Sequence, residues 1–492
     1  MGGGLLQLVA YGAQDAYLSG NPQITFWKGL FKRHTNFAME PFRVNLTGQA
    51  NWGVKHSATL PRHADLLYST YLEVVMPAGT FNNDQGRLGY NLIKYVELEI
   101  GGQQIDRLYG EWLYLWDALT SDFMTSKKLW NIVGGGPTSA TITPPGGSPY
   151  TAVTQNYSDA VTGSVTKPSG YYSTTNGSFT ASSSNTIVTD VTLPVTGTKA
   201  STIVYADPNA QCTSGKPALP NVLYIPLTFF YTRNPGAALP LIALQYHEVK
   251  INIQWQTQDF IKGDFTSAGN LTAPLQAALY VDYIYLDVEE RRRMAQESHE
   301  YLIEQTQYNE DKGISSYNNR IDLTFNHPVK ELVWVVQPNE YTDCSIMKKL
   351  DPNGSIYGNR LRPFTYDKDA VESQWLQING QDRLEKRYGD YFNQPQMYQH
   401  HSGLGGTIQT ATSLPIHQPG IYMYSFALKP EEHQPSGTCN FSRIDTATIV
   451  MNLDGNMTVN AGNDRTWDVR VYAVNYNILR VMSGMAGLAY SN

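Results

Sequence analysis

Two halves of this 492-residue chain contain the same short segments in the same order, which restricts the fold to one built on an internal duplication. The first half has Leu98-Glu-Ile-Gly-Gly-Gln followed by Leu108-Tyr-Gly-Glu-Trp112. The second half has Leu376-Gln-Ile-Asn-Gly-Gln followed by Arg387-Tyr-Gly-Asp-Tyr391. Ordered matches of this kind rarely arise between unrelated strands. We therefore expect two related β-rich units.

Two further pairs of segments lie upstream of these matches. Strand-like runs that end in proline occur at Tyr71 to Pro77 and at Leu332 to Pro338. Before them lie Arg43-Val-Asn-Leu-Thr47 and Arg320-Ile-Asp-Leu-Thr324. One pair alone carries little weight, but the four pairs share one order along the chain.

The length and composition indicate two all-β domains. A chain of 492 residues exceeds what one hydrophobic core organises, so two domains of more than about 150 residues each are expected. The counts of 33 Tyr, 41 Gly and 26 Pro favour strands and turns over helices.

The charge distribution gives no sign of a phosphate-binding surface. The formal net charge is -7, and basic residues are not clustered as a nucleic-acid site requires. Arg291-Arg-Arg293 directly follows Glu289-Glu290, so this run is interpreted as a locally neutralised connector. No direct contact with nucleic acid is expected.

The cysteines and the N-terminus point to folding in the cytosol. Cys212, Cys344 and Cys439 are odd in number, far apart and without CxxC spacing, so neither disulfides nor a zinc site is indicated. Leu5 to Leu18 lacks the basic region of a signal peptide, and no apolar stretch reaches about 18 residues.

Alternating apolar and polar residues predict several half-buried antiparallel strands. They lie at 42–47, 96–100, 249–256 and 321–325. Trp112, Trp116, Leu119 and Phe123 recur at spacings of three to four and predict a helix whose aromatic stripe is core packing. Periodicity alone leaves sandwiches, barrels and jelly rolls open.

Composition divides the chain into two domains and a linker. The first domain is expected at 31–290 and the second at 319–492, joined by a charged connector at 291–318. Residues 131–206 are rich in Ser, Thr, Gly and Pro and predict a long surface insertion in the first domain only.

No segment has the pattern of a catalytic, cofactor-binding or metal-binding site, and the chain is not expected to be an enzyme. No phosphate-loop motif and no GxSxG elbow occurs. His400-His401 and His247-Glu248 lack metal-ligand spacing. The carboxylates of the second repeat, Asp382, Glu385 and Asp390, are interpreted as its solvated face, although sequence alone does not exclude a carboxylate pair.

Three longer segments resemble major capsid proteins of nucleocytoplasmic large DNA viruses. They are the N-terminal run from Leu5 through Gly20-Asn-Pro-Gln-Ile-Thr-Phe26 to Phe37, the run Leu239 to Val249, and the run Gln434 to Asp445. The resemblance implies a double jelly roll, that is, two tandem eight-stranded antiparallel β-sandwiches with short helices in loops. The 131–206 insertion has no counterpart in the shared pattern.

The same resemblance implies a structural role in a virion shell. A homotrimer of two similar domains presents six similar wedges, so it forms a pseudo-hexagonal capsomer that tiles an icosahedral shell. Expected partners are neighbouring copies, minor capsid proteins, a penton protein and an internal membrane surface. Residues 1–30 are expected at the inner face and the insertion outside, with glycans possible at Asn156 and Asn176. Assembly is expected in the host cytoplasm.

A tandem carbohydrate-binding β-sandwich protein is the alternative. Lectins share the jelly roll, and this chain is rich in Tyr, Trp and Asn, so the fold does not separate the two functions. A glycoside hydrolase on a β-sandwich is a third hypothesis, which requires two carboxylates at one cleft.

Overall fold

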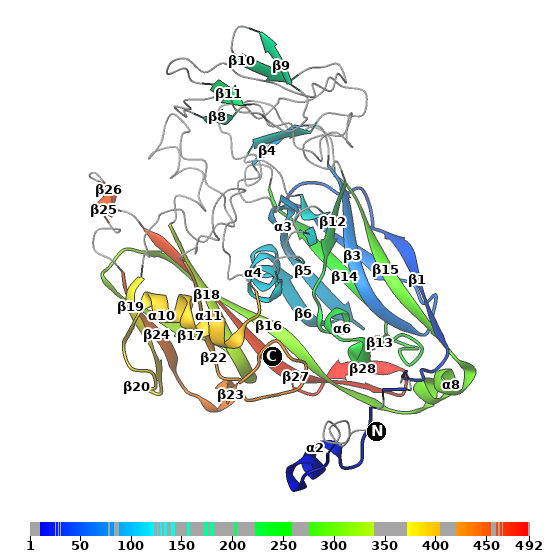
Figure 1. Ribbon diagram of the computed structural model, residues 1–492. Coiled ribbons are helices and arrows are strands. Elements are labelled where there is room, and N and C mark those ends of the chain that lie inside the picture. Colours follow the sequence, from blue (N-terminus) through cyan, green and yellow to red (C-terminus); the bar gives the residue numbers. More distant parts are fainter. Residues whose placement is uncertain are drawn as a thin grey trace, which may run out of the picture.

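The computed structural model is built from two β-sandwiches that lie side by side (Figure 1). It describes residues 10–24, 26–27, 29, 31–76, 79–82, 88–122, 125, 128–129, 132–134, 139–142, 155–157, 172–175, 178–181, 201–203, 222–257, 275–338, 371–403, 420–453, 459–460, 463–464 and 466–490.

The first sandwich consists of two antiparallel sheets with interleaved strand order. One sheet has the order β1 (Phe37–Asn45), β15 (Gln276–Leu286), β3 (Leu66–Val75) and β12 (Val222–Pro226), with β13 (Leu239–Pro240) also paired to β3. The other sheet has the order β2 (Lys55–Leu60), β14 (Val249–Trp255), β5 (Ile93–Ile100) and β6 (Gln103–Tyr109).

The second sandwich repeats this order strand for strand. One sheet has the order β16 (His299–Ile314), β27 (Trp467–Met482), β18 (Pro328–Pro338) and β22 (Ile421–Ser425), and it also includes β23 (Cys439–Asn440) and β28 (Met485–Leu488). The other has β17 (Asn318–Leu323), β24 (Ala447–Leu453) and β19 (Val371–Ile378), with β20 (Gln381–Asp382) and β21 (Arg387–Tyr388) both paired to β19. This order is that of a jelly roll, so the all-β double jelly roll is confirmed.

The predicted alternation places apolar side chains in the cores. In β14, Val249, Ile251, Ile253 and Trp255 are buried, as the period of two requires. The core of the second sandwich is formed by residues such as Ile321, Ile449 and Val471. These strands and the predicted ones at 42–47, 96–100 and 321–325 therefore each cover a core with one face.

The repeated Leu-x-Ile-x-Gly-Gln segment forms the same hairpin in both sandwiches. It joins β5 to β6 in the first copy and β19 to β20 in the second. The two turn residues have positive φ in each case, 59° and 86° at Gly101 and Gly102, and 51° and 73° at Asn379 and Gly380. Two-residue hairpin turns require this conformation, which Gly and Asn adopt most readily.

Three of the four matched pairs occupy equivalent places, and one does not. The Tyr-Gly segments lead into helices in both copies. Tyr71 to Val75 of the first proline-terminated run lies in β3 and the second run lies in β18, while Pro77 is outside the described residues. Arg43 lies in β1, whereas Arg320 lies in β17, which is the counterpart of β2. That pairing was wrong because short amphipathic strands share one alternating pattern wherever they lie in a sandwich.

The helices with described bounds are short, and all except α2, which precedes β1, lie between strands. They are α2 (Ala16–Ser19), α3 (Leu88–Leu92), α4 (Gly110–Thr120), α6 (Phe230–Arg233), α8 (Val288–Gln296), α10 (Gly389–Asn393) and α11 (Pro395–His400), with 3-10 turns η1 (Ala13–Asp15), η3 (Pro235–Ala237) and η5 (Phe441–Arg443). The predicted aromatic helix is α4, in which Trp112, Trp116 and Leu119 are buried as core. Phe123 lies outside the described residues. Among the described residues, no helix is long and apolar enough to cross a membrane.

The structure differs from the expected connector at 291–318. This range contains most of α8 and all of β16, and β16 pairs with β27 over most of its length. Its high content of Glu, Gln and Asn suggested a loop, yet the strand is formed because it joins a six-stranded sheet. The link between the sandwiches is therefore the short stretch around α8.

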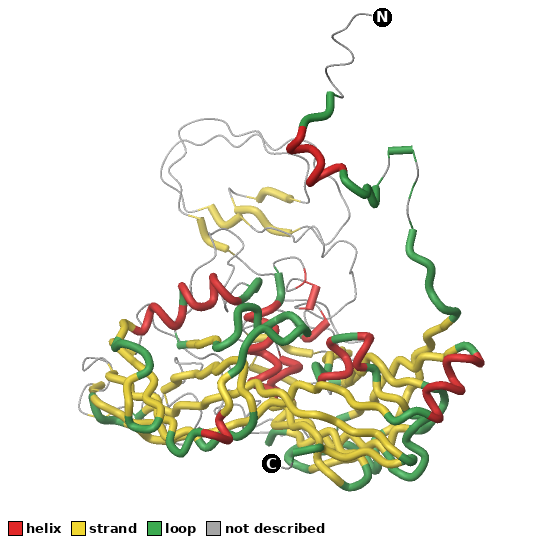
Figure 2. The backbone as a smooth tube through the Cα atoms, turned by 90° about the horizontal axis from the view of Figure 1, so that it is seen from below, coloured by secondary structure: helices red, strands yellow, loops and turns green. Residues whose placement is uncertain are grey.

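The insertion and the N-terminal segment lie at opposite ends of the molecule. Most of 131–206 lies outside the described residues. Apart from 132–134, the parts described are short strands, β7 (Ser139–Ile142) paired with β4 (Gly79–Asn82), β8 (Gln155–Tyr157) with β11 (Ser201–Ile203), and β9 (Tyr172–Thr175) with β10 (Ser178–Ala181). Figure 1 shows β8 to β11 above the sandwiches and α2 below them. Figure 2 shows the N-terminal segment extending away from the sheets.

Candidate functional site: the seam between the two sandwiches

The two sandwiches share an extensive contact, which we call the seam. It is formed by β6, α4 and α6 of the first sandwich and by β16, β18 and β27 of the second. Val333, Val335 and Val474 of the second sandwich belong to the same buried apolar cluster as the core of the first. The two units are thus joined by a continuous hydrophobic core as well as by the chain that links them.

The repeated Tyr-Gly-acid segment of the first copy is the centre of the seam. The ring of Tyr109 lies 4.4 Å from that of Tyr308 and 6.2 Å from that of Tyr472. Glu111 accepts two hydrogen bonds of 2.7 Å from the Arg470 guanidinium and one of 2.7 Å from the Tyr472 hydroxyl. Burial disfavours the charge of Arg470, but Glu111 outweighs it and raises the pKa of Arg470.

The helix that carries Glu111 starts at a glycine for a steric reason. A Cβ at Gly110 would overlap the backbone carbonyl oxygens of Ile93 and Tyr90. Only glycine therefore lets α4 begin this close to the backbone of α3 and β5.

A buried carboxylate beside these residues binds the backbone of the opposite sandwich. Asp106 in β6 accepts a 3.1 Å hydrogen bond from the amide of Thr306 in β16. Burial raises the pKa of Asp106 to about 6, while the Thr306 hydrogen bond and the charge of Arg233 oppose that rise. The Gln305 side chain, next to Thr306 in β16, donates to the carbonyl of Ile105, which precedes Asp106 in β6.

A second group of charges crosses the seam next to α4. Glu304 in β16 pairs with Arg233 of α6 and with Lys330 of β18, each at 2.8 Å. The Arg233 guanidinium lies 4.1 Å from the centre of the Trp116 ring. Lys330 is fully buried and also donates to the carbonyl of Pro430 at 2.6 Å. Each buried charge in this group therefore has an opposite charge within reach.

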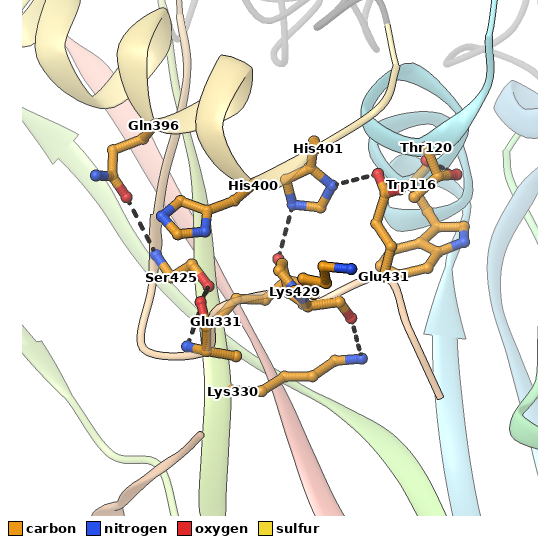
Figure 3. Close-up of polar contacts among 12 residues, drawn as sticks. Trp116, Thr120, Lys330, Glu331, Gln396, His400, His401, Ser425, Lys429 and Glu431 are labelled. Atoms are coloured by element: carbon orange, nitrogen blue, oxygen red, sulfur yellow. Dashed lines mark hydrogen bonds and ion pairs between the residues drawn. The ribbon is translucent and has the colours of Figure 1, made fainter. Parts of the chain in front are cut away.

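His401 lies between two carboxylates, one of which, Glu331, directly follows Lys330 in β18 (Figure 3). Its Nε2 lies 2.8 Å from Glu331 and its Nδ1 lies 2.9 Å from Glu431. Burial opposes the charge of His401, but the two carboxylates outweigh it and raise the pKa of His401 to about 9. The next residue, Ser402, donates to the carbonyl of Thr120 at the end of α4, so the loop spans both sandwiches.

The C-terminal hairpin, formed by the end of β27 and by β28, contacts the segment around His247 of the first sandwich. The amide of Tyr246 donates to the carbonyl of Gly484, and the His247 ring lies 3.0 Å from the carbonyl oxygen of Ala486. The Leu488 amide also donates to Gln103 at 3.4 Å. The segment around His247 therefore receives β28 of the second sandwich.

The charged side chains of the seam bind one another and thereby hold the two sandwiches together. Within the described ranges, no group of three His, Cys, Asp or Glu side chains is placed to hold a metal ion. The carboxylates of Glu111, Glu304 and Glu331 each face a cation of the same chain, and this pairing neutralises them. The arrangement fixes one geometry between two domains.

The sequence analysis identified several of these residues as notable but did not predict the roles that they have in the structure. His400-His401 and His247-Glu248 were considered as metal ligands, and the structure uses His401 and His247 as ties between the sandwiches. Arg291 pairs with Asp65 at 2.9 Å, while Arg292 pairs with Glu289 of the same helix and Arg293 pairs with Glu297 directly after it. In the Gln434 to Asp445 segment, the Asn440 side chain caps η5.

Sequence reasoning missed the charged residues of the seam. Arg470 offered a signal, because it interrupts the apolar run of β27. Glu111 offered another, because the acid of the Tyr-Gly-acid repeat recurs as Asp390. Neither signal identifies the partner, which lies more than 350 positions away in the chain for Glu111.

Comparison with known proteins accounts for this architecture. The family model described as "Major capsid protein N-terminus" matches residues 25–287, and the one described as "Large eukaryotic DNA virus major capsid protein" matches residues 290–487. The chain belongs to the major capsid proteins of large eukaryotic DNA viruses. The resemblance inferred from the three sequence segments is thereby confirmed, and capsid proteins of this family are structural proteins, not enzymes.

Individual relatives align with this chain over the full length of both sequences. The major capsid protein of Pyramimonas orientalis virus is 42% identical over 504 residues, and that of Phaeocystis pouchetii virus is 39% identical over 588 residues, with 100% of both chains covered in each case. The chain in the quasi-atomic model of the PBCV-1 virus capsid is 30% identical, with a TM-score of 0.65 over 95% of this chain and 100% of that chain.

Proposed function

We propose that three copies of this capsid protein form a pseudo-hexagonal capsomer and that such capsomers tile an icosahedral virion shell. The observation that carries the proposal is the repetition of one jelly roll, strand for strand, within a single chain. Three chains then supply six similar wedges around a threefold axis, and a hexagonal outline packs a flat facet with few gaps.

The seam supports this role because it makes the pair of wedges rigid. A hexagonal outline requires a constant angle between the two sandwiches, and a loosely linked pair would vary in that angle. The apolar cluster, the Glu111–Arg470 pair and the C-terminal hairpin together hold the two sandwiches in one geometry. A rigid pair also limits the entropy lost when copies associate.

We further propose that the N-terminal segment contacts an inner component of the virion. Most of its described residues are exposed, and Tyr17, Leu18, Phe26 and Trp27, with Phe31 directly after the segment, expose large apolar side chains at 87–94%. Exposed apolar groups of this density favour a partner surface. Minor capsid proteins, a penton protein and an internal membrane surface are the proposed partners, and glycans on the outer insertion and assembly in the host cytoplasm belong to the same proposal.

Solution mass and negative-stain images of the purified capsid protein test the trimer. A mass three times that of the chain and particles with a hexagonal outline are expected. A stable monomer at micromolar concentration without such particles contradicts the proposal. The tandem lectin alternative is not carried forward, because the family to which the chain belongs consists of capsid proteins.

A further inference from the structure

Residues 16–36, which we call the arm, form a basic and apolar stretch on an acidic protein. The whole chain has a formal net charge of -7, yet no acidic residue occurs between Asp15 and Glu40. The arm itself carries two lysines and one arginine, so all of its charged side chains are positive. A local reversal of the sign of charge indicates an anionic partner.

The apolar side chains of the arm are almost fully open to water. Five of them are 83–92% exposed, namely Leu18, Ile24, Phe26, Trp27 and Phe31. The rings of Phe26 and Trp27 lie 5.1 Å apart, edge to face, and their other surfaces remain exposed. Side chains of this size gain free energy when they leave water, so their exposure marks a surface for binding.

The cations of the arm are free, in contrast to a second basic run at the same end of the molecule. Arg291 to Arg293 of α8 each pair with a carboxylate. The arm enters β1 at Phe37, which pairs with Leu286 just before α8, so the two basic runs are close in space. Lys32 and Arg33 are exposed, and no acidic side chain of the described ranges pairs with either. The charges of the arm are therefore available to an external anion.

The position of the arm keeps the acidic sandwiches away from such an anion. Figure 1 places α2 at the end of the molecule opposite β8 to β11, and Figure 2 shows the described parts of the arm extending away from the sheets. Repulsion between exposed like charges falls off within a Debye length, which is about 8 Å at physiological ionic strength. An arm that reaches out can therefore bind an anionic surface that repels the rest of the protein.

The mixture of side chains favours a lipid surface over a nucleic acid. Tryptophan and other aromatic residues concentrate at the boundary between membrane and water, and lysine and arginine beside them bind anionic headgroups. Leu18 and Ile24 cannot stack on bases as aromatic rings do, but they partition into lipid. Charged residues interrupt the apolar ones well before the roughly 20 residues that a membrane span requires. The arm therefore suits the surface of a bilayer and does not suit its interior.

We infer that the arm binds a lipid surface that carries anionic headgroups. Phe26, Trp27 and Phe31 insert among the headgroups, and Lys32 and Arg33 pair with the negative groups there. This inference rests on the proposed inner contact of the N-terminal segment and names its partner. One arm offers few contacts, so firm attachment depends on several arms of one capsomer acting together.

Flotation of the full-length protein with lipid vesicles tests the lipid composition. The protein is expected to float with vesicles that contain phosphatidylcholine and phosphatidylserine. Binding to phosphatidylcholine alone is expected to be about 30-fold weaker or more, because each lysine or arginine near an anionic surface contributes about a factor of five. Raising the salt to about 1 M, where the Debye length is about 3 Å, is expected to weaken the binding to the mixed vesicles.

Charge reversal in the arm tests the cations. Lys32→Glu with Arg33→Glu is expected to weaken binding to the mixed vesicles about 30-fold or more. The matched control is Lys312→Glu with Lys429→Glu, which changes the net charge by the same amount at two lysines of the second sandwich that are both 66% exposed. This control is expected to bind as the wild type does.

Removing the rings tests the apolar contact. Phe26→Ser with Trp27→Ser is expected to weaken binding about 100-fold, because burying each ring contributes about a factor of ten. Trp27→Phe keeps an apolar ring and is expected to retain most of the binding. Circular dichroism checks that each variant is folded, and sedimentation velocity measures its oligomeric state.

The outcomes separate this inference from the proposed capsomer. A wild-type trimer that floats with neither kind of vesicle overturns the inference, assigns the arm to a protein partner and leaves the capsomer standing. Equal flotation with the two lipid compositions, or equal flotation of the wild type and both arm variants, also overturns it. A wild-type monomer overturns the capsomer, and the comparison of vesicles and variants still decides whether the arm binds anionic lipid.

Discussion

Removing one partner of the Glu111–Arg470 pair is expected to destabilise the capsid protein strongly. The two side chains are only 10% and 8% exposed, and two hydrogen bonds of 2.7 Å join them. Breaking a buried pair by removing one member leaves an uncompensated charge and costs about 3–5 kcal/mol. Glu111→Leu and Arg470→Met should each have an effect in this range. The Tyr472 hydroxyl also loses its acceptor when Glu111 is removed.

The double variant separates the charge effect from packing. Glu111→Leu with Arg470→Met removes both charges, so what remains is the loss of the acceptor of the Tyr472 hydroxyl, the loss of the Arg470 donor to Gln337 and altered packing, which together cost about 1–3 kcal/mol. The double variant should therefore be more stable than either single variant. The control is Glu300→Leu, which removes one member of the exposed Glu300–Arg480 pair, 57% and 53% exposed. Its effect should stay within about 1 kcal/mol.

Differential scanning calorimetry under identical buffer conditions measures these effects. For a domain of this size, 3–5 kcal/mol corresponds to a fall in Tm of about 6–20 °C. Hydrogen exchange at β6 and β16 shows whether the loss is at the seam. The reasoning is refuted if the single variants shift Tm no more than the Glu300 control, or if the two single effects add fully in the double variant.

Three further outcomes are expected. Because the folded-state pKa of His401 is raised to about 9, the stability from its charged contacts is present in full below pH 6.5 and lost as the pH rises through 9. Unfolding in urea should therefore show that the free energy of unfolding falls by a value on the order of 3 kcal/mol between pH 7 and 10, and His401→Gln should lack this fall. Gly110→Ala should destabilise more than Gly102→Ala, which meets no neighbouring atom and costs about 1–2 kcal/mol for its positive φ alone; equal Tm values would contradict the close-approach argument. Deleting residues 483–492 should raise hydrogen exchange at 241–249, where β28 docks, and unchanged exchange there would show that the hairpin does not hold the seam.

Periodicity and internal repetition predicted much of the fold. The alternation in β14 and the aromatic spacing in α4 depend on local geometry, and both elements form as expected. The connector at 291–318 was misplaced for the opposite reason. The polar composition of β16 is typical of a loop, yet the strand forms because β27 supplies hydrogen-bond partners from the far end of the chain.

The seam lay beyond the reach of pattern analysis. Glu111 and Asp390 hold the same place in the repeat, and the carboxylates of the second repeat were interpreted as a solvated face. Glu111 is buried against Arg470 and Asp390 is exposed, because only the Tyr-Gly-acid segment of the first copy faces the other sandwich of the chain. Sequence assigns the same chemistry to both residues, but burial depends on what lies opposite.

The sequence by itself determined that the chain contains two copies of one β-rich unit, since alternation, turn residues and repeat order are local properties of the chain. Three segments were enough to indicate the family. Only the tertiary structure decided how the copies meet, which charges are buried and which histidine joins two carboxylates. Those features depend on contacts between residues such as Glu111 and Arg470, 359 positions apart, and no local pattern encodes which distant residue will complete a contact.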